Sequence, residues 1–194
     1  MSGLADDPVL QAALSAASPV PYSGTAFRAM PGGWLVHNMS FEHLWAGSGA
    51  GRCNPAGVER LHLSAEKRTA QAEFRHYARK GGTDPDLAEC YEFAADVKLA
   101  RVLDLTSRVT RQIVGITLLQ ILADWEGDPL LPPPPPTRLQ SIGYWISKGH
   151  GNFSAILYPS RRRRAGRNLV IFRNRLNPRD AVIPRSQKPT KSWP

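Results

Sequence analysis

Strand-like and helix-like segments follow one another along this chain without the regular alternation that a parallel α/β sheet requires. Apolar and polar residues alternate as in strands over residues 25–30, 58–63 and 91–105. Helical spacing follows over residues 106–125, weakened at Gly115, and again after Thr137, with a stop at Gly149. Two further strands are predicted at 155–158 and 168–172, joined by an arginine-rich loop. This order predicts the α+β class, with strands and helices mixed in one sheet-containing domain.

A helix of about 15 residues is predicted between Ser64, a plausible N-cap, and Gly81-Gly82. Its apolar stripe consists of Ala70, Phe74, Tyr77 and Ala78. Glu73 lies beside this stripe, one turn from both Ala70 and Tyr77. A carboxylate at a buried edge is costly unless a partner uses it, although an ordinary surface acid with an i,i+4 contact is the alternative.

The length of 194 residues and a hydrophobic fraction of 42% fit a single compact domain with a real core. Residues 1–20 are interpreted as an N-terminal extension that is either a short helix or a loose end. Residues 21–175 form the predicted body, and residues 176–194 a basic, proline-rich tail expected to be mobile. The proline run 132–136 predicts an exposed polyproline connection within the body.

The net charge of +9 belongs to the C-terminal part of the chain. Residues 160–194 contain eleven Lys or Arg and one acid, whereas the other 159 residues contain fourteen bases and fifteen acids. The run Arg161–Arg164 allows a nucleic-acid-binding protein as an alternative. Aromatic residues are not interleaved with these bases as stacking platforms require, so direct nucleic-acid binding is not expected.

Cysteine and histidine usage argues against a disulfide framework or a metal site. Cys53 and Cys90 are the two cysteines, and the histidines lack metal-ligand spacing, so no metal is expected. The N-terminus carries Asp6 and Asp7 rather than the basic residues of a signal peptide. The longest apolar stretch, residues 113–123, is about half of a membrane span. A cytoplasmic protein with no membrane partner is therefore expected.

Four polar residues stand out as candidates for a site. Arg28 ends the first strand, Arg52 lies in the glycine-rich loop 44–57, Glu73 flanks the helix, and Ser160 ends a strand before a turn. A glycine-rich loop allows a ligand to approach the backbone, and an arginine within it suits phosphate or carboxylate. Each residue alone has an ordinary structural interpretation: a solvated arginine, a surface acid or a serine that caps a turn.

Seven short sequence pieces, taken in order, resemble the RES domain, the toxin half of a bacterial toxin–antitoxin class. They are Phe27-Arg28, Gly51-Arg52-Cys53-Asn54-Pro55-Ala56-Gly57, Leu61-His62-Leu63, Glu73, Leu103-Asp104-Leu105, Tyr158-Pro159-Ser160-Arg161-Arg162 and Asn168-Leu169-Val170-Ile171-Phe172. The resemblance covers about residues 25–175. Two positions depart from the family pattern: His62 replaces a usual tyrosine, and Cys53 replaces a usual tryptophan.

The resemblance implies an ADP-ribosyltransferase-like mixed sheet with flanking helices and a site that takes NAD as substrate. Carried over by position, Glu73, Arg52 and Ser160 are the catalytic residues. Arg28, Arg52, His62 and Asn54 would bind NAD, with His62 lining the nicotinamide pocket unless it is simply a sheet histidine. His62 could still stack or form hydrogen bonds, but it titrates near neutral pH, unlike tyrosine.

The reaction expected from this resemblance is cleavage of the nicotinamide–ribose bond by hydrolysis or phosphorolysis. Transfer of ADP-ribose to a protein is the main alternative, and a catalytically inactive interaction protein is another. The sequence does not distinguish the acceptors. The resemblance also implies a cognate antitoxin with a helix-turn-helix DNA-binding domain, which would cover the site.

Overall fold

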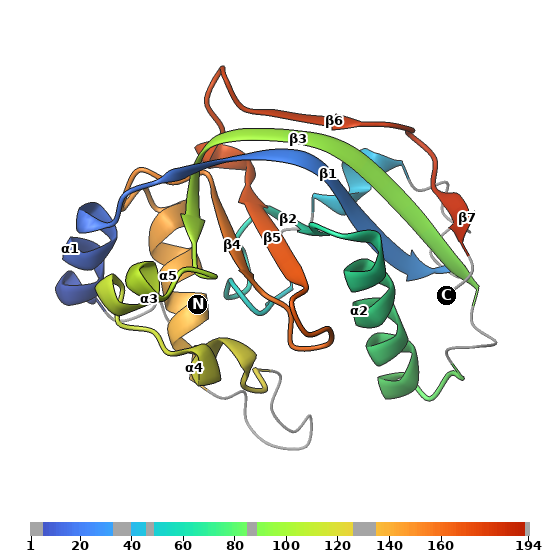
Figure 1. The fold of residues 1–194 in the computed structure, drawn as a ribbon, viewed down its shortest axis with the longest axis horizontal. Helices are drawn as coiled ribbons and strands as arrows, with labels where there is room; N and C mark the ends of the chain where they lie inside the picture. The colour runs from blue at the N-terminus through green and yellow to red at the C-terminus, as the bar shows by residue number, and fades with distance from the viewer. Residues whose placement is uncertain (1–5, 33–39, 46–48, 85–88, 126–134, 193–194) are drawn as a thin grey trace.

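A computed structural model describes residues 6–32, 40–45, 49–84, 89–125 and 135–192. A seven-stranded mixed sheet forms its centre, in the order β1-β2-β5-β4-β3-β6, with β7 also paired to β3 (Figure 1). The strands are β1 (Val20–Pro31), β2 (Arg60–Ser64), β3 (Cys90–Asp104), β4 (Ala155–Pro159), β5 (Arg167–Phe172), β6 (Ala181–Pro184) and β7 (Thr190–Ser192). The α+β prediction is thus confirmed.

The long strands β1 and β3 pair with each other over most of their length, antiparallel, from Val20↔Val102 to Pro31↔Cys90. Strand β1 also meets β2 at Phe27↔Ser64, so five strands form a closed circuit, β1-β2-β5-β4-β3. The pairing of β3 with β4 is parallel, and the pairing of β4 with β5 is antiparallel. The buried side chains of these strands divide between two core clusters, one with Ile156 and Val170 and the other with Leu61, Leu169 and Ile171.

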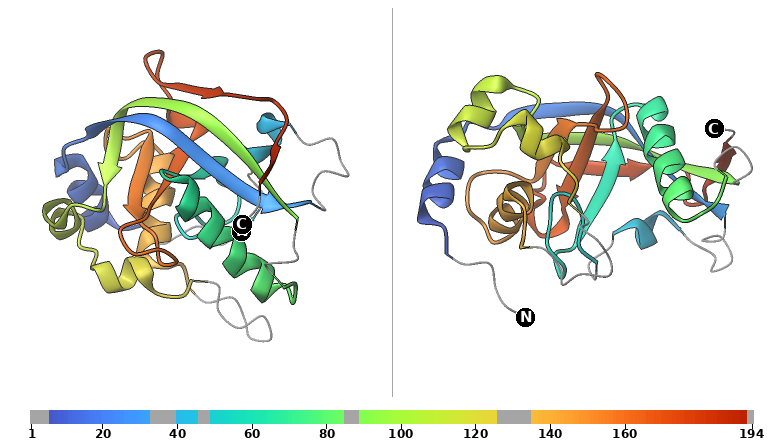
Figure 2. Two further views of the ribbon diagram at one scale, coloured as in Figure 1. Left: turned by 45° about the vertical axis from the view of Figure 1, so that its right-hand side comes forward. Right: turned by 90° about the horizontal axis from the view of Figure 1, so that it is seen from below.

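Helices lie at two places around this sheet (Figures 1 and 2). One group gathers near β4 and consists of α1 (Pro8–Ala16), α3 (Arg108–Ile113), α4 (Leu118–Leu122) and α5 (Arg138–Ser147). Helix α2 (Lys67–Lys80) stands apart from them and packs against β1. Short 3-10 turns occur at η2 (Phe41–Leu44) and η3 (Arg173–Arg175). The site described below lies beside α2, β1 and β2.

Several local expectations were right, and one cap was wrong. Thr137 caps α5 by accepting from the Gln140 amide, and the predicted helix 106–125 is interrupted at Gly115, whose φ is +64°. Ser64 does not cap α2: it ends β2, and its hydroxyl donates to Asn168 Oδ1 at 2.8 Å, while Glu66 is the N-cap residue. The β2–β5 ladder extends through the Ser64↔Asn168 pair, which delays the start of the helix.

Both ends of the chain take part in the fold. Leu10 and Leu14 of α1 are fully buried in the same core cluster as Ile142 and Phe153. At the other end, β6 and β7 pair with the outer edge of β3. Structured elements therefore lie outside the predicted body of residues 21–175 as well as within it. Residues 132–134 of the predicted polyproline connection lie outside the described part of the chain.

Among the described residues, none of the helices has the length and apolar character that crossing a bilayer demands. No group of three or more His, Cys, Asp or Glu side chains in the same residues is arranged to hold a metal ion.

Candidate functional site

A cavity of about 380 Å³ opens between α2, the end of β1, β2 and the loop before β2. Its volume lies within the range of pockets that bind small molecules. Arginine and aromatic side chains dominate its polar and apolar walls. The lining residues that matter below are Arg28, Arg52, Arg60, His62, Glu73, Tyr77, Tyr158 and Asn168.

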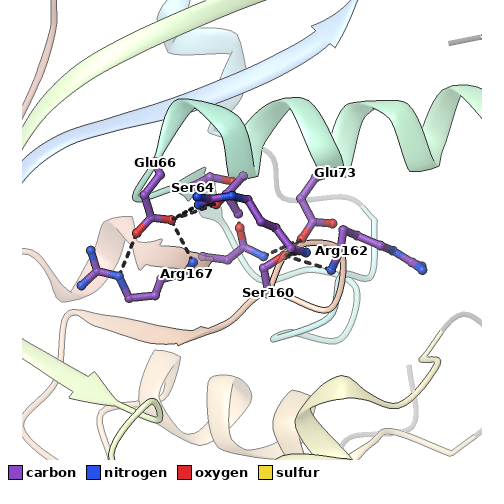
Figure 3. Close-up of polar contacts among 9 residues, drawn as sticks. Ser64, Glu66, Glu73, Ser160, Arg162 and Arg167 are labelled. Atoms are coloured by element: carbon purple, nitrogen blue, oxygen red, sulfur yellow. Dashed lines mark hydrogen bonds and ion pairs between the residues drawn. The ribbon is translucent and has the colours of Figure 1, made fainter. Parts of the chain in front are cut away.

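Glu73 is held in place by two neutral hydrogen-bond donors (Figure 3). Its Oε1 accepts from Ser160 Oγ and from Asn168 Nδ2, both at 2.8 Å. These donors come from β4–β5 and the turn between them, so the sheet fixes a carboxylate carried by the helix. Among the described residues, Oε2 receives no hydrogen bond, and it is therefore able to interact with a ligand. The Glu73 carboxylate, whose burial beside the apolar stripe costs desolvation free energy, thus has two specific hydrogen-bond partners.

Ser160 organises the turn that follows β4. While its hydroxyl donates to Glu73, its oxygen accepts from the backbone amides of Arg162 and Arg163, at 3.1 and 3.3 Å. The Arg162 guanidinium lies against His76 Nε2 at 2.5 Å, and Arg163 donates to Thr69 Oγ1. Arg162 and Arg163 therefore pack along α2, whereas Arg161 and Arg164 are exposed.

The part of the pocket lining around His62 carries a concentration of positive charge. Arg28 comes from β1, Arg60 from β2 and Arg52 from the glycine-rich loop. Arg60 is 6% exposed, and burial, followed by the charge of Arg28, lowers the pKa of its guanidinium. Three cations at one end of a pocket attract an anion that carries more than one charge.

His62 lies among these arginines and stays neutral. Burial lowers the pKa of His62 well below its usual 6.5, and the charges of Arg60, Arg28 and Arg52 lower it further. His62 Nε2 lies 3.3 Å from Asn54 Oδ1. Because an amide oxygen only accepts, Nε2 carries the proton, and Nδ1 is left as an acceptor.

Arg52 has a structural contact besides its place in the pocket wall. Its Nη1 donates to the carbonyl oxygens of Ile121 and Ala123, at 2.9 and 2.7 Å. The loop itself is tied by paired backbone bonds between Gly51 and Asn54 and by a bond from Gln140 Nε2 to the Gly51 carbonyl. Arg52 therefore joins the end of α4 to the pocket, and within the described part of the chain its other N–H groups make no hydrogen bond that would keep them from a ligand.

The structure brings most of the predicted site residues together. One cavity is lined by Arg28, Arg52, His62 and Glu73. Ser160 is not in the lining, but its hydroxyl donates a hydrogen bond to Glu73. Asn54 is fully buried outside the lining and contacts His62, so it acts on the pocket through that histidine.

Cys53, at the position of the family's tryptophan, is structural. It is fully buried, and burial raises the pKa of its thiol to about 12. Its neighbour Tyr158 lines the cavity while its phenol group interacts with the Cys53 thiol.

Four of the lining residues named above were not selected as site residues from the sequence: Arg60, Tyr77, Tyr158 and Asn168. Arg60 shares a strand face with His62, Asn168 follows the arginine loop, and Tyr77 lies one turn after Glu73. Alternation along β2 was the available signal for Arg60, since His62 was already a candidate. Nothing local distinguishes Asn168 from an ordinary strand residue, because its partner Glu73 is 95 positions away.

Comparisons with known proteins identify both a family and a fold. The family model described as the RES domain matches residues 25–193. A search of curated proteins gave no match. Among solved structures, a chain in the crystal structure of the M. tuberculosis MbcT–MbcA toxin–antitoxin complex is similar with a TM-score of 0.66 and 20% identity. The similarity covers 96% of this chain and 93% of that one, and at this identity it establishes a shared fold.

Proposed function

This chain belongs to the RES-domain family, and we propose that it cleaves the nicotinamide–ribose bond of NAD as the toxin of a toxin–antitoxin system. The observation that carries the proposal is the pocket itself. It places Glu73, held by Ser160 and Asn168, in the same cavity as Arg28, Arg52 and Arg60. A carboxylate at one wall and three guanidinium groups at another suit a substrate with a cationic ring and two phosphates.

In the proposed reaction, Glu73 and the arginines of the pocket have different roles. Departure of nicotinamide leaves positive charge on the ribose, as in glycoside hydrolysis, and a carboxylate beside the sugar stabilises that charge. Glu73 takes this role, with Oε2 directed to the ribose or to the attacking group. The arginines hold the pyrophosphate by charge-assisted hydrogen bonds. Neutral His62 offers an acceptor to the same substrate without adding to the positive charge.

The acceptor distinguishes the two main versions of the reaction. Water would yield free ADP-ribose, and inorganic phosphate would yield ADP-ribose phosphorylated at the anomeric carbon. Transfer to a protein side chain is the second candidate reaction, since the same Glu73 environment would serve it. The pocket favours no acceptor among these, so the product has to be identified directly.

The first experiment incubates purified protein with NAD and measures nicotinamide and the ADP-ribose product, with and without phosphate. Stoichiometric ADP-ribose without phosphate indicates hydrolysis, and a phosphate requirement indicates phosphorolysis. If folded protein releases no nicotinamide under either condition, both readings are rejected. Transfer would then be tested by labelling proteins with radioactive NAD.

Glu73→Gln is expected to lower NAD turnover by at least about 100-fold, because the amide cannot stabilise positive charge on the ribose. The amide oxygen can still accept from Ser160 and Asn168, so the melting temperature should change little. Glu59→Gln is the matched control: Glu59 is exposed, pairs with Arg173 and lies outside the cavity. Near-normal turnover by Glu73→Gln would exclude Glu73 as the catalytic carboxylate.

The partner that this proposal implies is a cognate antitoxin, with a helix-turn-helix DNA-binding domain, that covers the pocket in the cytoplasm. The similar structure is itself a toxin–antitoxin complex, which supports the inference. Expression of this chain alone should arrest growth and deplete NAD, and co-expression of the antitoxin should prevent both. Growth arrest that persists in Glu73→Gln would separate toxicity from NAD cleavage.

A further inference from the structure

In the predicted apolar stripe of α2, Tyr77 is the residue whose side chain is both large and exposed. Phe74 and Ala70, on the same stripe, are each 3% exposed, whereas Tyr77 is 48% exposed. The Tyr77 side chain nevertheless lines the cavity that contains Glu73. An aromatic ring that is half open to solvent and also borders a pocket has a surface available for a ligand.

The position of Tyr77 along the helix identifies which part of NAD it can reach. Tyr77 lies four residues after Glu73, about 6 Å further along the helix axis and on the same side of it. If Glu73 acts at the nicotinamide-side ribose, the ring bonded to that ribose lies within one helical turn of Glu73. The adenine ring is separated from the same ribose by two phosphates and a second ribose.

Charge points to the same end of the substrate. The oxidised nicotinamide ring is a cation, and the wall formed by Arg28, Arg52 and Arg60 repels it while attracting the phosphates. The ring is therefore directed away from these three arginines, which gather around His62. Arg162 also approaches α2, where its guanidinium lies against His76, whose ring adjoins that of Tyr77. Arg161 and Arg52 as well as the acids Glu73 and Asp124 contribute to the electrostatic surroundings of Arg162.

We propose that Tyr77 binds the nicotinamide ring of NAD by stacking, and so takes over the aromatic role that His62 leaves vacant. His62 is held by Asn54 among three arginines, which is an unfavourable place for a cationic ring. A phenol ring attracts a pyridinium cation through cation–π interaction in addition to stacking. This inference rests on the proposed function, because it presumes that NAD is the ligand.

One consequence is selectivity for the oxidised form of the dinucleotide. The reduced ring carries no positive charge, so it loses the cation–π contribution from Tyr77. NAD should therefore bind several-fold more tightly than NADH, and the Tyr77→Ala variant should have lost most of this preference.

Binding is measured by titration calorimetry in the Glu73→Gln background, which prevents turnover. The two probes are NAD and ADP-ribose, which lacks only the nicotinamide ring. Tyr77→Ala is expected to weaken NAD binding by about 5- to 30-fold and to leave ADP-ribose binding within about twofold. Tyr77→Phe, which keeps the ring, should retain most of the NAD affinity. Arg79→Ala is the matched control on the same helix, exposed and outside the cavity.

The outcomes separate this inference from the function on which it rests. If the Glu73→Gln parent binds neither probe, the proposed function fails and the assignment of Tyr77 falls with it. If the parent binds both and Tyr77→Ala weakens neither, Tyr77 is not a ligand contact. If both probes are weakened equally, Tyr77 contacts adenine or acts only through folding, and the nicotinamide assignment is rejected.

Discussion

At the scale of single residues, Ser160 links the Glu73 carboxylate to the backbone of the arginine turn. One hydroxyl serves as donor to Glu73 and as acceptor for two amides, and it is 7% exposed. A buried hydrogen bond to a charged group typically contributes about 1.5–3 kcal/mol. The loss of this hydroxyl therefore affects both the orientation of Glu73 and the conformation of residues 160–163.

Ser160→Ala should lower kcat for NAD cleavage by about tenfold or more, with a smaller change in KM, because Glu73 loses one of two positioning bonds. Unfolding by urea should show a loss of about 1–3 kcal/mol from the unsatisfied amides. Ser141→Ala is the control, since that hydroxyl bonds only the Thr137 carbonyl within α5. An unchanged kcat in Ser160→Ala would show that Asn168 alone positions Glu73.

His62 makes the stability of the protein depend on pH. Burial and three neighbouring arginines hold the pKa of His62 well below 6.5 in the folded state. In the unfolded chain the imidazole titrates near 6.5, so between these two values the unfolded state binds more protons. Stability contributed by neutral His62 is therefore present above about pH 6.5 and is lost as the pH falls towards the folded pKa.

The free energy of unfolding, measured with urea, is expected to be lower at pH 5 than at pH 7.5. His62→Gln should reduce this difference, since glutamine does not titrate. The dependence should not vanish, because burial and the charge of Arg162 also lower the pKa of His76. A His62→Gln variant with the full wild-type pH dependence would contradict the assignment to His62.

At the scale of elements, the contact between α5 and the glycine-rich loop fixes the arginine wall. A Cβ built on Gly143 of α5 would lie 1.6 Å from the Cys53 carbonyl oxygen and 3.3 Å from the Phe172 ring. The helix thus approaches the loop so closely that only glycine fits there. The same loop carries Arg52 and Asn54, so this packing sets the position of one wall of the pocket.

Gly143→Ala should destabilise the protein, although alanine favours helix by about 1 kcal/mol. The added methyl group must displace backbone rather than a flexible side chain, and overpacking of this kind costs at least about 1–3 kcal/mol. KM for NAD should rise as Arg52 moves. Gly24→Ala in β1 is the control, since its nearest contact is the Tyr22 hydroxyl at 3.7 Å. Thermal melts and steady-state kinetics of both variants test this contact.

At the scale of the whole molecule, basic side chains of residues 160–194 pair with acidic side chains elsewhere in the chain. Arg167 bonds Glu66, Arg173 pairs with Glu42 and Glu59, Arg185 pairs with Asp96, and Lys191 pairs with Glu89. The positive charge that suggested a nucleic-acid partner is therefore used partly within the fold. The same segment supplies β6 and β7, which cover the outer edge of β3.

A chain that ends at Asp180 should unfold at lower urea concentration and self-associate. It loses the strands that pair with β3 from Cys90 to Lys98, and an exposed strand edge pairs readily with other chains. Light scattering during size-exclusion chromatography measures the association. A monomeric truncated chain with unchanged stability would show that β6 and β7 contribute nothing to the sheet.

Between residues 25 and 172 the sequence by itself determined the kinds and order of most elements, because strand alternation, helix caps and turn glycines are local. It did not predict β6 or β7, and it left α1 open. Alternation placed β2, β4 and β5 within about two residues, and Thr137 identified the start of α5. The order of short motifs also indicated the RES family and, through it, Arg28, Arg52, Glu73 and Ser160. These residues lie far apart in sequence, and their grouping came from the resemblance rather than from local chemistry.

Only the tertiary structure decided which side chains meet in the pocket and how they are charged. The sheet brings Asn168 to Glu73 and gathers Arg60 with Arg28, which no local pattern encodes. It also leaves Tyr77 48% exposed at the cavity, although its helix spacing predicts burial and Phe74 on the same stripe is 3% exposed. Burial and neighbouring charge depend on long-range packing, so the protonation of His62 and the surroundings of Glu73 were decided by the fold.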